Sequence, residues 1–267
     1  MRILLYSDYP ALLEALQEES KRYSGIELFQ ANSDTEILTL PDFQFLLLAP
    51  LAETTEVGAT PCTTNQLNTW QQKISHLVEL CSLRQAQLTL ISSDLVFSKQ
   101  QIAVNEQDIP ENTTPLAKSL LQLEETVAAM PQSIILRTPP TLSASPKGGL
   151  AQVLANCKKQ QAPQTISYRG LQPLDDLARI LLSIILQLDA GAKTFGLFHY
   201  AGSEPLSQSE LFVTLKRSLN LETNLNKETA DQQLTLSTQH LLETFGIHPR
   251  AWREKLPALL EQLNEAN

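Results

Sequence analysis

Short apolar runs alternate with amphipathic segments along the first half of the chain. Residues 2–6, 43–48 and 88–91 are apolar runs of strand length, the pattern of parallel strands that are covered on both faces. Residues 10–23 and 65–83 carry apolar side chains at helical spacing. Because strands and helices alternate, the pattern predicts an α/β fold with a doubly wound parallel sheet.

The second half continues this alternation with shorter segments. Residues 133–137 read as a further buried strand and residues 150–159 as a helix. Residues 141–149 between them are rich in Pro, Ser and Gly, which indicates a loop. We therefore expect a first domain over residues 1–138 and a smaller α/β lobe over residues 139–267, the two partly interleaved.

Composition narrows the class of protein. The 267 residues have 42% hydrophobic side chains and a net charge of −9, which argues against nucleic acid or an anionic membrane surface as a partner. Cys62, Cys81 and Cys157 are odd in number and widely spaced, so they predict neither a disulfide framework nor a metal site. The most apolar run, residues 177–188, is too short to span a bilayer. We expect a cytoplasmic protein with reduced thiols, no membrane segment and no bound metal.

Polar residues follow the strands where a ligand would be expected. Ser92, Ser93 and Asp94 come directly after the run at 88–91, and Arg137 and Thr138 end a later strand. In open α/β sheets, ligands bind in the crevice at the carboxyl ends of the strands. These five residues are therefore the candidate site residues, all of them for binding a substrate except Ser93, which is the candidate for catalysis.

The motif Ile-Ser-Ser-Asp-Leu-Val-Phe at residues 91–97 is similar to the I-S-[ST]-D-x-V-F signature of the dTDP-4-dehydrorhamnose reductases, which are extended short-chain dehydrogenases. Residues 134–138 resemble the family's I-L-R-T strand, and residues 196–207 its G-x-[YF]-H-x-A-G-x-x-x-x-S motif. Residues 236–247 and 252–256 resemble its C-terminal pattern. This resemblance implies a Rossmann-like first domain, a substrate lobe similar to a sugar-nucleotide site, and NAD(P)H-dependent reduction of a sugar nucleotide.

The first strand–helix turn departs from the pattern that a dinucleotide requires. Its three glycine positions fall on Ser7, Pro10 and Leu13. Glycines allow the backbone to approach the pyrophosphate, whereas Pro10 has no N–H and cannot adopt a positive φ. Asp8 adds a carboxylate where phosphates would lie, and it is more simply explained as the cap of a helix that Pro10 begins. We expect no cofactor-binding residues here.

The resemblance also locates the positions of the catalytic pair. Residues 106–110 resemble the family's E-x-D-x-P segment, and the register from there places its tyrosine at Leu116 and its lysine at Leu120. In these reductases the tyrosine donates a proton to the reduced carbonyl, and the lysine lowers its pKa and holds the ribose. Leucine side chains can do neither. Ser93 remains as a residual catalytic residue, insufficient by itself.

A register shifted by two residues would place Thr114 and Lys118 at the same spacing. However, Thr114 precedes Pro115, which is typical of a helix cap, and its hydroxyl is far less acidic than a phenol. We therefore expect a helix without that catalytic pair.

The predicted helix carries an apolar stripe. Leu116, Leu120, Leu123 and Val127 share one face. Such a stripe suits either a sealed cleft or a surface for a partner helix. A protein partner, or a second copy of the chain in a homodimer, is therefore expected to bind along residues 116–127.

Several residues of the second half are interpreted as structural. His199 in an alternating strand is expected to be a histidine with satisfied hydrogen bonds, and Ser207 to cap a helix. Gly246 indicates a helix end, and Trp252 a core residue. No zinc-protease, zinc-ribbon or α/β-hydrolase motif is present in the sequence.

Three functional hypotheses follow. The first is a non-catalytic homologue of these reductases that acts as a binding, regulatory or scaffold protein without a cofactor, for which the resemblance offers a precedent in the regulatory subunit of methionine adenosyltransferase. The alternative is an NAD(P)H-dependent dTDP-4-dehydrorhamnose reductase-type enzyme that uses NADP or NAD. The third is a sugar-nucleotide-binding module without a protein partner.

Overall fold

A parallel sheet forms the centre of the computed structural model, which describes the chain except residues 51–56, 58–63, 146–147, 160–166, 222–233 and 266–267. Its six strands lie in the order β10-β6-β4-β3-β1-β2, and every neighbouring pair is parallel. The strands are β1 Arg2–Tyr6, β2 Glu27–Ala31, β3 Phe45–Leu48, β4 Gln87–Ser93, β6 Ser133–Thr138 and β10 Gly196–His199. The predicted α/β fold with a doubly wound, Rossmann-like sheet is confirmed.

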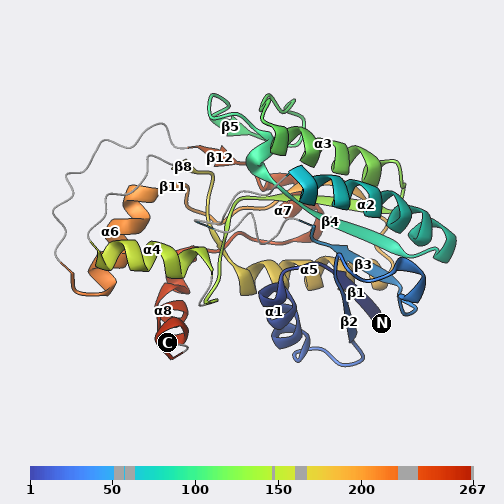
Figure 1. Ribbon diagram of the computed structural model, residues 1–267, viewed down its shortest axis with the longest axis horizontal. Coiled ribbons are helices and arrows are strands. Elements are labelled where there is room, and N and C mark those ends of the chain that lie inside the picture. The colour runs from blue at the N-terminus through green and yellow to red at the C-terminus, as the bar shows by residue number, and fades with distance from the viewer. Residues whose placement is uncertain (51–56, 58–63, 146–147, 160–166, 222–233, 266–267) are drawn as a thin grey trace.

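Helices cover both faces of this sheet (Figure 1). On one face lie α1 Pro10–Ser20 and α5 Leu174–Asp189, and on the other α2 Thr64–Arg84 and α3 Pro115–Ala128. Alternate residues of β1 accordingly point into different cores: Ile3 and Leu5 into the first, Leu4 and Tyr6 into the second. Burial on both faces explains why the strands are almost entirely apolar.

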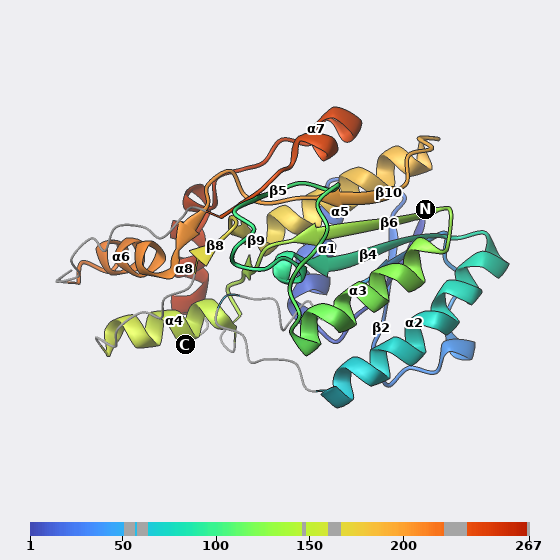
Figure 2. The same ribbon diagram turned by 90° about the horizontal axis from the view of Figure 1, so that it is seen from above.

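A smaller group of elements, the C-terminal lobe, lies beside one end of the sheet (Figures 1 and 2). Its helices are α4 Gly149–Lys158, α6 Gln208–Ser218 and α8 Leu256–Glu265, which pack around a third core with the short helix η4 Trp252–Glu254. Short strand pairs lie outside the six-stranded sheet. They are β7 Thr141–Leu142 with β9 Gln172–Pro173, β8 Ser167–Tyr168 with β11 Leu206–Ser207, and β5 Ala103–Val104 with β12 Thr235–Leu236. The remaining helix, α7 Gln239–Phe245, contacts the edge strand β10.

Helix ends follow the predicted capping chemistry at three positions. The Thr114 hydroxyl accepts a hydrogen bond from the Ala117 N–H at 3.3 Å and begins α3. Ser207 and Glu210 form a capping box at the start of α6. Gly246 ends α7 with a left-handed φ of 65°, which glycine adopts without strain.

The prediction that Asp8 caps α1 is wrong. The helix begins at Pro10 as expected, but its N-cap is Tyr9, which makes no side-chain cap hydrogen bond. Asp8 instead accepts a hydrogen bond from the backbone N–H of Ser33 at 2.7 Å, beyond the end of β2. The sequence around Asp8 has the pattern of a helix cap. In the fold, however, the carboxylate binds the Ser33 N–H, a backbone donor that is far away in the sequence.

Cys81 and Cys157 are buried free thiols, while Cys62 lies outside the described residues. Trp252 is fully buried, as predicted. Within the described ranges no helix has both the length and the apolar character needed to cross a membrane.

Candidate functional site at the carboxyl edge of the sheet

The crevice of an open α/β sheet forms where the strand order reverses, which here is between β1 and β3. Ser7 follows β1, is fully buried, and donates a hydrogen bond from its hydroxyl to the Ala49 carbonyl after β3 at 2.9 Å. The same oxygen accepts a hydrogen bond from the Tyr9 N–H at 3.2 Å. A hydrogen-bonded serine therefore joins the two strand ends across the position of the crevice.

The first turn of α1 offers little to a phosphate. The Tyr9 N–H is used by Ser7, and Pro10 has no N–H at all. The side chain of Tyr9 is only 4% exposed and belongs to the core that also contains Ala49. Helix N-termini bind anions through free backbone N–H groups, and two of those are lost here.

Carboxylates also lie at this end of the sheet. The Asp8 carboxylate is held near the end of β2 by Ser33, and the Tyr6 hydroxyl donates a hydrogen bond to the Thr35 carbonyl at 3.1 Å. Burial and, to a smaller extent, the negative charges of Asp8 and Asp34 together raise the pKa of Tyr6 to about 12. The local potential is therefore unfavourable for a second anion.

The hydroxyl of Ser93, the predicted catalytic residue, caps a short helix. Ser93 is fully buried and its Oγ accepts a hydrogen bond from the Leu95 N–H at 3.2 Å, which caps the short helix η3 Asp94–Val96. Leu116 is half-buried and Leu120 is 2% exposed, both packed in the second core. Neither leucine supplies a group that exchanges protons.

The apolar stripe of α3 is part of the chain's own core. Leu120, Leu123 and Val127 are at most 2% exposed and pack with residues of α2 and β4. The expectation that this stripe receives a partner is therefore wrong for these side chains, because the sheet and α2 already cover them. Of the two alternatives predicted for the stripe, a sealed cleft or a surface for a partner helix, the structure agrees with the sealed cleft.

Two of the predicted substrate-binding residues belong to a buried ionic network. The Ser92 hydroxyl donates a hydrogen bond to Glu124 Oε1 at 2.5 Å. Arg137 donates to the same carboxylate from Nε to Oε1 at 3.0 Å and from Nη2 to Oε2 at 2.6 Å. The side chains of Glu124 and Arg137 are 7% and 5% exposed. The Ser92 hydroxyl and the Arg137 guanidinium, which the sequence suggested for a ligand, thus both bind Glu124.

The remaining candidates lie beside this network. The strand register pairs Ser92 with Arg137 and Ser93 with Thr138, and the Thr138 hydroxyl donates to the Ser92 carbonyl at 3.4 Å. The structure therefore brings the predicted site residues together: four lie on the adjacent strands β4 and β6, and Asp94 follows directly in η3. All five are also buried.

Asp94 faces a residue that the sequence analysis missed. Burial raises the pKa of Asp94 to about 7, while Arg169, whose Nε lies 3.9 Å from Asp94 Oδ2, opposes the shift. Arg169 also donates hydrogen bonds to the backbone carbonyls of Ser98, Ile102 and Thr235 at 2.9–3.2 Å. These four partners lie far from Arg169 in the sequence, so no local pattern could have indicated them.

His199 is buried, but it is not the satisfied histidine that was predicted. Neither ring nitrogen has a hydrogen-bond partner, and the ring meets Phe97 edge-on at a centroid distance of 5.6 Å. Burial and, to a smaller extent, the positive charges of Arg137 and Arg169 together lower the pKa of His199 to about 3. The imidazole is therefore neutral at physiological pH.

Comparison with known proteins identifies the family. The sequence model of the RmlD substrate binding domain matches residues 63–265, more than half of the chain. This chain belongs to the RmlD family. The predicted resemblance to dTDP-4-dehydrorhamnose reductases and related extended short-chain dehydrogenases is confirmed at the level of the family. No curated protein matches the chain significantly.

Solved structures of sugar-nucleotide enzymes share the RmlD-family fold of this chain. A dTDP-4-dehydrorhamnose reductase from Clostridium acetobutylicum has a TM-score of 0.77 at 19% identity, over 99% of this chain and 100% of that one. The Bacillus anthracis reductase, crystallised with NADP, has a TM-score of 0.69 at 12% identity, over 98% of each chain. A UDP-glucuronic acid 4-epimerase from Bacillus cereus, crystallised with NAD, has a TM-score of 0.75 at 14% identity, over 99% of each chain. At these identities the likeness concerns the fold alone.

The nicotinamide dinucleotide implied by the RmlD family does not fit the residues of the first turn in its usual position. Ser7 holds the Ala49 carbonyl and the Tyr9 N–H, and Asp8 adds negative charge. A pyrophosphate there would meet fewer donors and more repulsion than in a glycine-rich turn.

Proposed function

We propose that this RmlD-family chain is a non-catalytic homologue of the sugar-nucleotide reductases and acts by binding. The observation that carries the proposal is the hydrogen bonding of the Ser7 hydroxyl to the Ala49 carbonyl and the Tyr9 N–H. These groups follow β1 at the turn where a dinucleotide's phosphates would need free donors. The two leucines at the positions of the proton-donating tyrosine and the lysine support it.

The extent of the family match also supports the proposal. The matched residues, 63–265, exclude β1, α1, β2 and β3, which contain the altered turn. They include α2, β4, α3, β6 and the C-terminal lobe, and the family model that matches them is described as a substrate binding domain. A sugar nucleotide is therefore the proposed ligand, held between the sheet and the C-terminal lobe.

Calorimetric titration tests this proposal. The purified protein is titrated with NADPH, NADH and dTDP-glucose in separate experiments. We expect binding of dTDP-glucose and no heat from either dinucleotide up to concentrations on the order of 1 mM, the weak limit of specific binding. Micromolar binding of NADPH would contradict the proposal, and so would silence with all three ligands. A Ser7→Ala variant, which removes the bridge but supplies no glycine, serves as the control for NADPH.

The second candidate is an NAD(P)H-dependent reductase of the dTDP-4-dehydrorhamnose reductase type. It is favoured by the fold shared with the reductase that was crystallised with NADP, over almost the whole of both chains. Its test is oxidation of NADPH in the presence of dTDP-4-dehydrorhamnose. Turnover that is lost in a Ser93→Ala variant would establish this function and overturn the first.

A protein partner or a homodimer remains part of the first proposal, in a regulatory or scaffold role. Because the apolar side of α3 is buried, the surface of this helix left for a partner is the opposite side, which presents the exposed residues Lys118, Gln122 and Glu125. Light scattering at several protein concentrations measures self-association. A monomer at every concentration would exclude the homodimer.

A further inference from the structure

Three segments of the chain cross at one glycine between the sheet and the C-terminal lobe. A side-chain carbon added to Gly202 would lie 2.0 Å from the Leu171 carbonyl oxygen and 3.3 Å from that of Arg250. Gly170 has a φ of +135°, and a carbon added there would lie 2.7 Å from the Gly202 carbonyl oxygen. Only glycine allows backbones to approach this closely. The crossing therefore fixes where the segment around Arg250 runs.

That segment belongs to two cores at once. Ile247 is 4% exposed in the core of α1 and α5, whereas Trp252 is fully buried in the core of the C-terminal lobe. Between them the Arg250 carbonyl accepts a hydrogen bond from the Ser203 N–H at 3.1 Å. Residues 247–252 thus join the sheet to the C-terminal lobe through a short stretch of chain.

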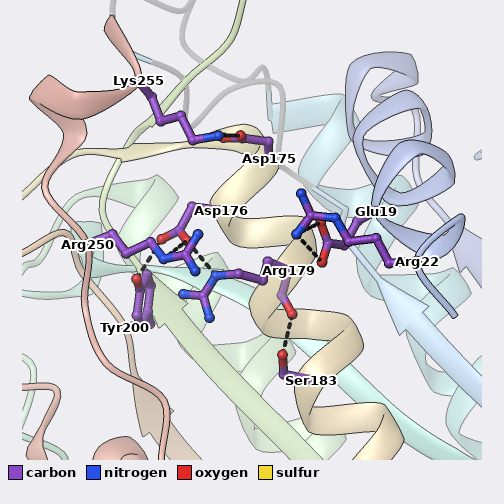
Figure 3. A network of polar contacts seen from close by, with 9 residues as sticks. All are labelled: Glu19, Arg22, Asp175, Asp176, Arg179, Ser183, Tyr200, Arg250 and Lys255. Atoms are coloured by element: carbon purple, nitrogen blue, oxygen red, sulfur yellow. Dashed lines mark hydrogen bonds and ion pairs between the residues drawn. The ribbon is translucent and has the colours of Figure 1, made fainter.

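The side chain of Arg250 adds an ionic contact to this stretch (Figure 3). Its Nε lies 3.8 Å from Oδ1 of Asp176 in the first turn of α5. The same carboxylate accepts hydrogen bonds from Arg179 Nε at 2.8 Å and from the Tyr200 hydroxyl at 2.6 Å. The side chain of Asp176 is 2% exposed and that of Arg250 is 51% exposed. Arg250 is therefore the outermost and most loosely held of the three groups around this carboxylate.

We propose that residues 247–252 form an ionic clamp that holds the C-terminal lobe against the sheet, with Arg250–Asp176 as its releasable contact. Release leaves Asp176 with Arg179 and Tyr200, so the buried carboxylate stays neutralised and hydrogen-bonded and the fold persists. The half-exposed guanidinium can instead meet salt ions, which screen such a pair. The clamp does not depend on a bound ligand and goes beyond the proposed binding function.

Hydrogen exchange at the Ser203 amide tests the clamp, because this N–H reports directly on contact with Arg250. The variants are Arg250→Ala and the control Arg22→Ala. Arg22, just after α1, also places a mostly exposed guanidinium on a buried carboxylate, that of Glu19 at 3.3 Å, but away from the clamp. We expect Arg250→Ala to raise the exchange rate at Ser203 about fivefold, the upper range for a partly exposed ion pair. Arg22→Ala should leave the rate within about twofold.

Two further measurements keep the result interpretable. Raising the salt concentration to about 1 M, where the screening length is about 3 Å, should raise the wild-type rate towards that of Arg250→Ala and leave the variant unchanged. An Arg250→Lys variant keeps the charge and should give an intermediate rate. An unchanged rate in Arg250→Ala, an equal rise in Arg22→Ala, or a uniform rise at all amides would overturn the clamp, the last because it reports global destabilisation.

Discussion

The buried pair of Glu124 and Arg137 allows a quantitative test of whether the candidate site residues are structural. Both side chains are at most 7% exposed and share three hydrogen bonds of 2.6, 3.0 and 3.2 Å, with a fourth to Glu124 from Ser92 at 2.5 Å. Removing one charge from such a pair leaves the other buried and unpaired, which costs about 3–5 kcal/mol. We therefore expect Glu124→Leu and Arg137→Met each to lower the free energy of unfolding by this amount.

The double variant separates pairing from burial. Replacing both partners by apolar side chains removes both charges. Such replacements are roughly neutral or stabilise the folded state by about 1–4 kcal/mol. The remaining loss would come from the Ser92 hydroxyl, which loses its acceptor at a cost of about 1–3 kcal/mol. The double variant should therefore be more stable than either single variant.

Urea unfolding followed by circular dichroism measures these differences, with the slope against denaturant as a check on two-state behaviour. Single variants that lose less than about 1 kcal/mol, or a double variant that loses the sum of the two, would refute the reasoning. The residues would then not depend on each other, and Ser92 and Arg137 would be free for a ligand. Ser92→Ala provides the functional control: loss of dTDP-glucose binding with unchanged stability would assign Ser92 to the ligand.

Three further predictions concern other buried groups. The pKa of His199 falls to about 3 in the folded chain, below the 6.5 of an exposed histidine. Its contribution to the free energy of unfolding is therefore complete above pH 6.5 and declines as the pH falls towards 3. His199→Phe should remove this decline, of at most about 5 kcal/mol, from the free energy of unfolding measured against pH. The pKa of Asp94 rises from 3.8 to about 7, so the folded state binds this proton more tightly and the free energy of unfolding declines as the pH rises from about 4 to 7. Asp94→Asn should remove this decline, of at most about 4 kcal/mol, as measured by urea titrations at several pH values. Gly202→Ala forces a carbon to 2.0 Å from the Leu171 carbonyl oxygen. This clash should cost on the order of 3 kcal/mol and lower the melting temperature by about 6–12 °C, whereas an unchanged melting temperature would show that the crossing can relax.

Local patterns in the sequence determined the strands and helices, and they also showed which residues of the family's cofactor and catalytic motifs are replaced in this chain. Apolar runs and helical spacing predicted the strands and helices because both are set by periodicity within a few residues. The missing glycines at Ser7, Pro10 and Leu13, and the leucines at 116 and 120, could also be read directly, because each position is fixed by a motif. The caps Thr114 and Ser207 follow from the same short-range chemistry.

Only the tertiary structure decided which polar groups meet. The partners of Ser7, Ser92 and Arg169 lie 42, 32 and 66–75 residues away, with Asp94 the most distant from Arg169. Those contacts depend on the order of strands in the sheet and on how α3 packs over it, which no local spacing encodes. The errors at Asp8 and the α3 stripe have the same cause, whereas His199 lies where the fold brings no hydrogen-bond partner to either ring nitrogen. A hydrogen bond or a buried face is completed by whatever the fold brings near, and in this chain the fold brought the candidate site residues to one another.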